Sequence, residues 1–465
     1  MDQLIALVKD VNAIVWGPPM LLLLAGVGLY LAFGLKLAPQ RHLVYAFRLM
    51  WAGRKKSGAS GDITPFNALM TAMAAHVGTG NIAGVATAVY YGGPGAIFWM
   101  WVIAVIGMGT MFCEATLAVH YREKDELGNT VGGPMYYIKN GLGEKWKWLA
   151  TLFALFGMLA AAGIGTTVQS HSMSDALFDT FGINPLVTGI IAAILSGAVL
   201  LGGIKRIGDV TGKLVPVMAT TYVLSGILIL ALHITEIPAA LSLIVECAFT
   251  QTAATGGFAG ATVWAAIKFG FARGVFSNEA GMGSSPIAHA VAQTDNPVSQ
   301  GTLAMIGVFM DTLVICTMTG LVIIVTGAWK SGANGAAMTN LAFSSGLPGF
   351  GKYMVTLGMV LFAFSTLIGW SFYSEKCTQY LFGVKAITPF RVAWVLLIPI
   401  GTLPQVDLGS LWLVADMLNA LMAIPNLIAL MLLSPVIFRL SKDYWASLKK
   451  PSPAGTGKIE NHTDT

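Results

Sequence analysis

Long apolar segments recur along the chain, separated by short polar or glycine-rich stretches. A helix that crosses a bilayer needs about 20 apolar residues. Eleven segments reach or approach that length: 15–36, 66–91, 95–120, 148–170, 185–202, 214–233, 258–290, 298–327, 353–382, 389–402 and 408–438. The shorter stretch 237–249 is typical of an amphipathic or re-entrant piece. The pattern therefore predicts an all-α integral membrane protein with about eleven transmembrane helices.

The composition also indicates a protein whose surface is largely in contact with lipid. Hydrophobic residues make up 55% of the chain and charged residues 11%, whereas ordinary soluble proteins carry about 25% charged residues. The first apolar run begins near Ala13. It is too long for a signal-peptide core and its N-terminal flank is not basic, so we expect a retained helix.

Loop charges predict the orientation. With the N-terminus outside, 21 of the 27 Lys and Arg residues fall on the cytoplasmic side, and only Lys9, Lys330 and Lys352 lie outside. This asymmetry follows the positive-inside rule. The net charge of +5 therefore reflects cytoplasmic loops and does not indicate nucleic-acid binding. The polar tail 451–465 has a composition typical of disorder.

Two apolar segments contain helix-breaking residues near their centres. Residues 78–81 are Gly-Thr-Gly-Asn, and residues 274–286 are Gly-Val-Phe-Ser-Asn-Glu-Ala-Gly-Met-Gly-Ser-Ser-Pro. Such breaks persist in a membrane only where they are buried in protein or line a cavity. A simpler interpretation is that Gly80 and Gly84 form a GxxxG packing face. That interpretation explains neither Asn81 nor the second break.

The spacing of the breaks predicts an internal repeat. The broken helices are the first and the sixth of ten helices that follow the initial one, which is typical of the inverted repeats of secondary transporters. We therefore expect an extra helix and cytoplasmic loop (1–60), a first five-helix repeat (61–235), an extracellular connection (236–257), a second repeat (258–440) and a cytoplasmic disordered tail (441–465).

A broken helix offers binding groups without charged side chains. Amides at the N-terminus of a half-helix attract a carboxylate. Carbonyls at the C-terminus of a half-helix attract an ammonium group or Na⁺. One break can therefore hold both ends of a zwitterionic amino acid.

Three motifs resemble those of a known transporter family. Residues 92–101 (Gly-Gly-Pro-Gly-Ala-Ile-Phe-Trp-Met-Trp), 78–84 and 273–281 are similar to motifs of the alanine or glycine:cation symporters, also called sodium:alanine symporters. The resemblance covers about Trp16 to Arg439. It implies a LeuT-type 5+5 inverted repeat with one extra N-terminal transmembrane helix. It also implies a plasma-membrane symporter, not an enzyme, that takes alanine or glycine with Na⁺ as its coupling ion and needs no cofactor.

The resemblance also implies the site residues. The substrate would contact Thr79, Gly80, Asn81, Gln169, Phe276, Ser277, Asn278, Thr366 and Trp370. Sodium would be held by the carbonyls of Ala74 and Val77 and the hydroxyls of Ser365 and Thr366.

Each of these side chains also has a structural interpretation. Gln169 could make an interhelical hydrogen bond, worth about 0.6 kcal/mol in a membrane protein. Ser365 and Thr366 could bond to carbonyls of their own helix. Trp370 could be a packing residue, and His76 is expected to be structural.

The rival mechanism is proton coupling in the same fold. Sodium prefers hard oxygen ligands and needs no titratable group, whereas a proton needs a titratable group at membrane depth. Glu114, Glu279 and Asp311 are the candidates, and Asp311 could instead be a polar anchor between helices. We also expect Glu279 and Arg273 to pair as an outer gate. A channel would need a continuous polar lining, which the apolar helices do not provide.

Overall fold

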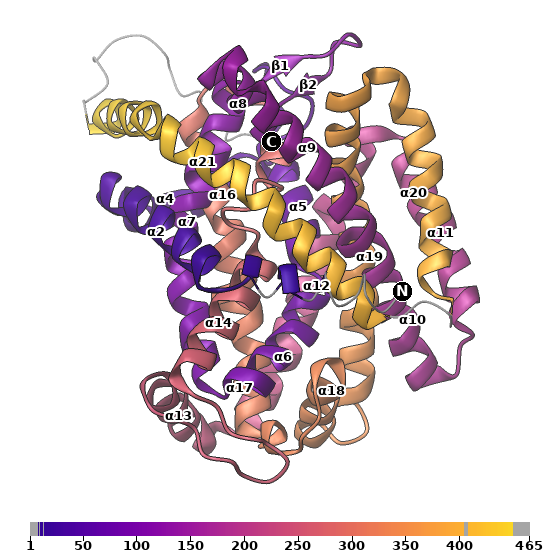
Figure 1. Cartoon of the computed structure of the whole chain (residues 1–465). Helices are drawn as coiled ribbons and strands as arrows, with labels where there is room; N and C mark the ends of the chain where they lie inside the picture. Colours follow the sequence, from indigo (N-terminus) through magenta and orange to yellow (C-terminus); the bar gives the residue numbers. More distant parts are fainter. Residues whose placement is uncertain (1–7, 9, 13, 404–407, 450–465) are drawn as a thin grey trace, which may run out of the picture.

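The computed structural model describes residues 8, 10–12, 14–403 and 408–449. Within these ranges the regular elements are helices and one short β-hairpin, joined by loops that contain three isolated β-bridges (Figure 1). The predicted disorder of residues 451–465 falls outside the described residues.

In the part of the chain that the structure describes, seven helical segments are long and apolar enough to cross a membrane. They are α7 (Gly95–His120), Glu144–Phe181, α12 (Gly203–Leu232), Pro297–Val325, α19 (Gly351–Phe382), Val384–Gly401 and Trp412–Leu448 of α21 (Leu408–Lys449). Three of these segments consist of several pieces. The pieces are η2 (Glu144–Trp146), α9 (Lys147–Ala161), η3 (Ala162–Thr167) and α10 (Val168–Phe181); α16 (Pro297–Val308), η5 (Phe309–Cys316) and α17 (Thr317–Val325); and η7 (Val384–Ala386) with α20 (Ile387–Gly401). Each segment overlaps a predicted span, which confirms a multi-pass membrane protein.

The other four predicted spans correspond to shorter or interrupted helices. Two are unbroken: α2 (Pro18–Gly34) and α11 (Pro185–Leu200), with 17 and 16 residues. Two are broken: α5 (Pro65–His76), η1 (Thr79–Asn81) and α6 (Ala83–Gly92) form the first, and α14 (Val263–Asn278) and α15 (Pro286–Ala290) form the second. Both broken helices begin with a threonine N-cap, because Thr64 accepts from the Asn67 amide and Thr262 from the Ala265 amide.

The remaining elements lie between or beside these helices. They are α3 (Ala38–Arg41), α4 (Leu43–Ala52), β1 (Glu123–Lys124), β2 (Thr130–Val131), α8 (Pro134–Leu142), η4 (Ile234–Glu236), α13 (Ile237–Phe249), η6 (Ala328–Lys330) and α18 (Gly335–Gly346). The strands pair antiparallel, with Glu123 opposite Val131. In Figure 1, α8 and the hairpin lie at the top and α13 and α18 at the bottom.

The last helix continues further than the sequence pattern predicts. We placed its end near residue 440 and a disordered tail from 441, but α21 extends to Lys449. Aromatic contacts explain the difference: Trp445 stacks on His42 at 3.9 Å between ring centres, and the Tyr444 hydroxyl lies 2.8 Å from that of Tyr45. The start of the predicted tail is therefore wrong.

Close packing brings α19 against the first broken helix. A Cβ atom on Gly369 would lie 2.7 Å from the backbone nitrogen of Ala75. Only a glycine allows α19 to approach α5 so closely just before the break. This approach places the middle of α19, with Ser365 and Thr366, beside the end of α5.

Candidate substrate and ion site

The first break is a short interruption that is wholly buried. Helix α5 ends at His76, residues Thr79–Asn81 form one 3₁₀ turn, and α6 begins at Ala83. The Gly78 amide donates to the Asn81 side-chain oxygen at 2.9 Å, as a capping contact. In an unbroken helix that amide would donate to the carbonyl of Ala74. The break therefore releases the Ala74 carbonyl at the end of α5.

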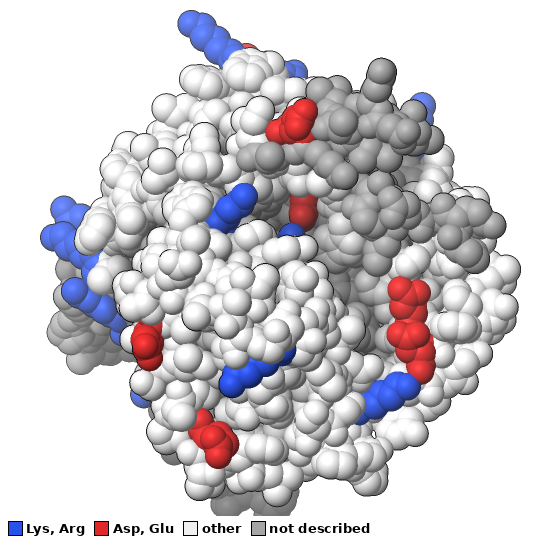
Figure 2. Space-filling view, turned by 60° about the horizontal axis from the view of Figure 1, so that its bottom comes forward, with Lys and Arg blue, Asp and Glu red and all other residues white. Residues whose placement is uncertain are grey.

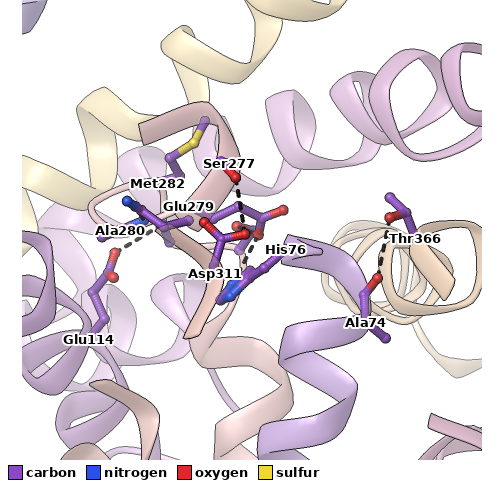
Figure 3. A network of polar contacts seen from close by, with 12 residues as sticks. Ala74, His76, Glu114, Ser277, Glu279, Ala280, Met282, Asp311 and Thr366 are labelled. Carbon is purple, nitrogen blue, oxygen red and sulfur yellow. Dashed lines mark hydrogen bonds and ion pairs between the residues drawn. The ribbon is translucent and has the colours of Figure 1, made fainter. Parts of the chain in front are cut away.

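Two hydroxyls of α19 meet the released carbonyls. Ser365 Oγ lies 3.3 Å from the Val77 carbonyl oxygen, and Thr366 Oγ1 lies 3.3 Å from that of Ala74 (Figure 3). Both hydroxyls also donate to the Phe362 carbonyl of their own helix at 2.9 Å. The predicted sodium ligands therefore lie together, and the predicted back-bonding is present as well.

The two measured oxygen–oxygen distances can be compared with those around a small hard cation. Calcium, an ion of nearly the same size as Na⁺, binds oxygen at roughly 2.3–2.6 Å, so neighbouring ligands at right angles lie about 3.3–3.7 Å apart. The two oxygen–oxygen distances of 3.3 Å agree with that spacing. All four residues are buried, which keeps competing water away.

Unpartnered polar atoms surround the first break. Among the described residues, Oε1 of Gln169 and Oγ1 of Thr79 are buried and have no hydrogen-bond partner. The Gln169 amide nitrogen is held by the Ile164 carbonyl of η3 at 3.0 Å. A Cβ on Gly78 would lie 3.7 Å from Gln169 Oε1 and 2.7 Å from Thr366 Oγ1. Because a buried polar atom without a partner costs about 1–3 kcal/mol, this arrangement suits a polar ligand.

Gly80 and Gly84 do not form a shared packing face. A Cβ on Gly84 would meet nothing within 4 Å. Gly84 instead lines a cavity of about 960 Å³, which is described below. The ring of Phe276 lies against Gly80, 3.3 Å from where its Cβ would be. The GxxxG interpretation is therefore wrong, and Gly80 allows Phe276 to approach the break.

The second break begins later than the sequence pattern predicts. Helix α14 continues to Asn278, so Phe276, Ser277 and Asn278 occupy its last turn and are not unwound. Glu279 ends the helix in the left-handed region with φ 56°. The unwinding expected from Gly274 is wrong, because α14 packs tightly on α7 there: a Cβ on Gly274 would lie 2.6 Å from Ile103.

The polar residues at the end of α14 bond to the π-helical segment η5. Ser277 Oγ donates to Asp311 at 3.0 Å, and the Asn278 amide donates to Thr312 at 3.1 Å. Asp311 also accepts from the Asn81 amide at 2.6 Å. Asp311 thus joins the first break to α14, as expected of a polar anchor between helices, and Figure 3 shows Ser277 and His76 on either side of it.

The gate pair predicted between Arg273 and Glu279 is wrong. Arg273 instead forms a salt bridge with Asp416 of α21, with Nη2 and Oδ2 at 3.2 Å. Glu279 accepts from Ser284 at 2.5 Å, and its Oε2 lies 3.7 Å from His76 Nε2. The left-handed backbone at Glu279 turns its carboxyl inward, away from Arg273.

Glu114, which the sequence presents only as a candidate proton carrier, accepts hydrogen bonds from the second break. Glu114 of α7 accepts from the amides of Gly281 and Gly283 at 3.2 and 3.0 Å, and from the Asn426 side chain at 2.5 Å. The sequence signal for this residue is that Glu114 is an acidic residue within the apolar segment 95–120. Its partner Asn426 lies 312 residues away, so spacing along the chain could not reveal the contact.

Trp370 packs beside the site on η3. Its side chain fills the space beside Gly165, and its ring meets Tyr373 edge-on at 5.6 Å between centres. It is buried, one turn beyond Thr366. These contacts match the packing interpretation of Trp370, while Thr366 faces the end of α5.

A cavity of about 960 Å³ leads toward the site from the end of the molecule that carries α13 and α18. Helices α6, α10, α14, α18, α19 and α21 contribute to its wall. Arg273 and Asp416 lie in that wall, as do Ala83 and Gly84 of α6 just after the first break. Phe276, one turn along α14 from Arg273, lies against Gly80. Figure 2 shows this end of the molecule, mostly uncharged and hollowed above its centre.

Comparison with known proteins identifies the family. A profile described as the sodium:alanine symporter family matches residues 1–455. The chain is 48% identical over 446 residues to the sodium/alanine symporter AgcS of Methanococcus maripaludis, covering 95% of this chain and 97% of that protein. It is also 48% identical over 447 residues to an uncharacterized transporter of Haemophilus influenzae, covering 96% and 97%.

A solved structure shares the architecture. The crystal structure of MhsT in complex with L-phenylalanine matches with a TM-score of 0.56 and 15% identity, covering 83% of this chain and 99% of that one. At this identity the match shows the fold alone, and it confirms a LeuT-type, all-helical protein. The family and the relatives are transporters, so this protein is a transporter and not an enzyme. The chain belongs to the sodium:alanine symporter family.

Proposed function

We propose that this protein is a sodium-coupled symporter that imports small neutral amino acids, alanine or glycine, by alternating access. It would lie in the plasma membrane as a 5+5 repeat with one extra helix, its N-terminus outside and its C-terminus in the cytoplasm. One observation carries the proposal: the hydroxyls of Ser365 and Thr366 meet the carbonyls of Val77 and Ala74, which the break in the first helix releases.

Sodium and substrate would bind on two sides of the same break. Sodium would lie among the four oxygens and hold the end of α5 against α19. The substrate carboxylate would lie at the amides of Thr79 and Gly80, where η1 leads into α6, because the N-terminus of a helix attracts anions. The Gln169 Oε1 atom, which has no partner among the described residues, would accept a hydrogen bond from the substrate ammonium group.

The residues beside Gly80 favour a small substrate. Phe276 lies against Gly80 at 3.3 Å from the position of a Cβ, which leaves little space for a long side chain. Ser277 and Asn278, which we expected to contact the substrate, already bond to Asp311 and Thr312. In the proposed mechanism they hold the end of α14 in place beside the substrate.

The alternative is a proton-coupled amino-acid transporter of the same fold. The observation that favours it is the burial of three carboxyl groups, Glu114, Glu279 and Asp311, which are at most 3% exposed. Ionisable groups at membrane depth are often functional. However, Glu114 and Asp311 each accept three hydrogen bonds, which accounts for them as structural anchors.

Uptake of labelled alanine into proteoliposomes separates the two mechanisms. We expect uptake with an inward Na⁺ gradient and none when K⁺ replaces Na⁺ under an inward proton gradient. Uptake under the proton gradient alone would refute sodium coupling and direct attention to Asp311 and Glu279.

A further inference from the structure

Helix α4, which lies between α2 and the first broken helix, has two different faces. One face packs against the protein, and its residues are Leu43, Ala46, Phe47 and Met50. The outer face carries Val44, Arg48 and Trp51, which are neighbours because they are three and four residues apart in a helix. Val44 and Trp51 are 70% and 66% exposed, and Arg48 is exposed as well. An arginine therefore lies between two exposed apolar side chains.

Basic residues surround this outer face. Between residues 36 and 61 the chain has six basic residues and no acidic one. All six are exposed, and none forms a salt bridge with another residue that the structure describes; they are Lys36, Arg41, Arg48, Arg54, Lys55 and Lys56. The end of α21, where Trp445 stacks on His42, adds two exposed basic residues and one exposed acidic residue; they are Arg439, Lys442 and Asp443. The surface around α4 is therefore strongly positive.

The contacts of α4 place it where three predicted membrane spans begin or end. Helix α2 ends eight residues before α4 begins, and Figure 1 shows both at the left of the molecule with the end of α21. The Phe66 amide, at the start of α5, donates to the Gly53 carbonyl at 3.1 Å. The Tyr45 hydroxyl lies 2.8 Å from that of Tyr444, just after the last predicted span. These three ends lie on one side of the membrane in the predicted topology, so we expect α4 at that membrane surface.

We propose that the outer face of α4 binds the head groups of anionic phospholipids. The guanidinium groups of Arg41 and Arg48 donate to lipid phosphate oxygens, which arginine can bind through two parallel hydrogen bonds. Val44 and Trp51 enter the boundary between head groups and acyl chains, where tryptophan is favoured. The inference depends on neither the substrate nor the coupling ion of the transporter.

The mixed character of the outer face favours a lipid over a soluble anion. A soluble phosphate would neutralise the arginines but leave Val44 and Trp51 in water, whereas a lipid covers both kinds of side chain. The excess of positive charge favours an anionic lipid over a zwitterionic one. Each basic residue near an anionic membrane surface strengthens binding about fivefold.

A lipid bound to α4 would also hold the first broken helix. The Arg54 guanidinium lies over the rings of Trp51 and Phe66, at 3.9 and 4.8 Å from their centres. On the inner face, Phe47 meets Phe309 of η5 edge-on at 5.9 Å between ring centres. A head group that fixes α4 therefore stabilises its packing on α5 and η5, and anionic lipid should raise the unfolding temperature.

Quenching of tryptophan fluorescence by brominated lipids tests this inference. The full-length protein is placed in phosphatidylcholine vesicles that contain brominated phosphatidylglycerol or, at the same mole fraction, brominated phosphatidylcholine. The chain has 12 tryptophans, so the signal of Trp51 is the difference between the wild type and Trp51→Phe. We expect half-maximal quenching of that signal at a mole fraction about tenfold lower for phosphatidylglycerol. This preference should shrink in 1 M KCl, which screens exposed charges.

Substitution of the two arginines should remove the preference. Arg41→Gln and Arg48→Gln should each reduce it about fivefold or less, and together they should bring the two lipids within about twofold of each other. Lys124→Gln, which changes an exposed lysine of β1, is the matched control and should leave the preference unchanged. In neutral detergent, added phosphatidylglycerol should raise the unfolding temperature of the wild type more than that of the double variant.

Four results would overturn the inference. The first two are equal quenching by the two lipids and a preference that survives the double substitution. The third is reversal of the quenching by millimolar glycerol phosphate, which would indicate a site for a soluble anion. The fourth is a Trp51 signal that neither lipid quenches, with a dimer in size-exclusion chromatography, which would indicate that a second copy covers this face. Absence of sodium-driven uptake, by contrast, would refute the proposed function and leave the lipid preference intact.

Discussion

At the first break, the carbonyls of Ala74 and Val77 meet hydroxyls of α19, and the side chains of Thr79 and Gln169 have polar atoms without partners among the described residues. At the second break, between Asn278 and Pro286, the side chain of Glu114 accepts from two backbone amides and Asn426 bonds to the Gly281 carbonyl. The first break leaves polar atoms without partners among the described residues, whereas at the second break the protein supplies the acceptor.

The difference indicates that a break in a transmembrane helix can have either a structural role or a ligand-binding role. An amide or carbonyl inside a membrane protein must find a partner. At the second break the protein supplies that partner, so the break has a fixed structure that positions Ser277 and Asn278. Where the partner is incomplete, as at the first break, the unpaired groups are free for a ligand, and we propose that the substrate and the ion bind there.

The largest effect should follow removal of the Glu114 carboxyl group, the acceptor at the second break. Glu114→Ala leaves two backbone amides and the Asn426 amide without their acceptor, at about 1–3 kcal/mol each, so we expect a fall of several degrees or more in the unfolding temperature and loss of transport. Thermal unfolding in detergent checks this. Glu126→Ala, which changes an exposed glutamate between β1 and β2, is the control and should change neither property. A stable, active Glu114→Ala variant would refute the claim that the Glu114 carboxyl group stabilises the second break.

A methyl group at the first break should abolish sodium-driven uptake without unfolding the protein. In Gly78→Ala the new Cβ would lie 2.7 Å from Thr366 Oγ1, so the hydroxyl must move away from the Ala74 carbonyl. Gly84→Ala is the matched control, since its Cβ meets nothing within 4 Å. Equal uptake by the two variants would show that the space around Gly78 is not used.

The effect of substituting Thr366 on the Na⁺ dependence of uptake should depend on whether the new side chain keeps a hydroxyl group. We expect Thr366→Ala to raise the Na⁺ concentration for half-maximal uptake about tenfold or more, since one oxygen ligand is lost. Thr366→Ser keeps the hydroxyl and should remain within about threefold of the wild type. Uptake as a function of Na⁺ concentration measures both. An unchanged Na⁺ dependence in Thr366→Ala would remove this residue from the ion site.

The smallest of these effects concerns the substrate. Gln169→Leu should raise the apparent KM for alanine about five- to tenfold, as expected for one lost hydrogen bond, with little change in Na⁺ dependence. Gln40→Leu serves as the control, because Gln40 bonds to the Val105 carbonyl instead. If Gln169→Leu leaves KM unchanged, Gln169 serves only to hold the Ile164 carbonyl of η3.

The sequence predicted the features that depend on local composition. Apolar length located the helices, and Gly78, Gly80 and Asn81 located the first break, because glycine and a polar side chain at membrane depth disfavour a helix wherever they occur. The limits of the second break were less predictable. Gly274 is a helix breaker by propensity, yet packing on Ile103 keeps it helical.

Contacts between distant parts of the chain could not be predicted. The partner of Arg273 is Asp416, 143 residues away, although Glu279 is the nearer acidic residue in sequence. The interruption in the eighth predicted segment was also missed: Phe309–Cys316 is π-helical, and within it Asp311 bonds to Asn81 and Ser277. The periodicity of apolar residues along the chain does not predict those contacts.

The most direct test of the central claim is the apparent KM for alanine, measured in proteoliposomes at several external Na⁺ concentrations. Because ion and substrate would share the first break, each should increase the affinity for the other by the same factor. We predict that KM falls as Na⁺ rises in the wild type and that Thr366→Ala requires higher Na⁺ for the same fall. A wild-type KM that does not change with Na⁺ would contradict the account.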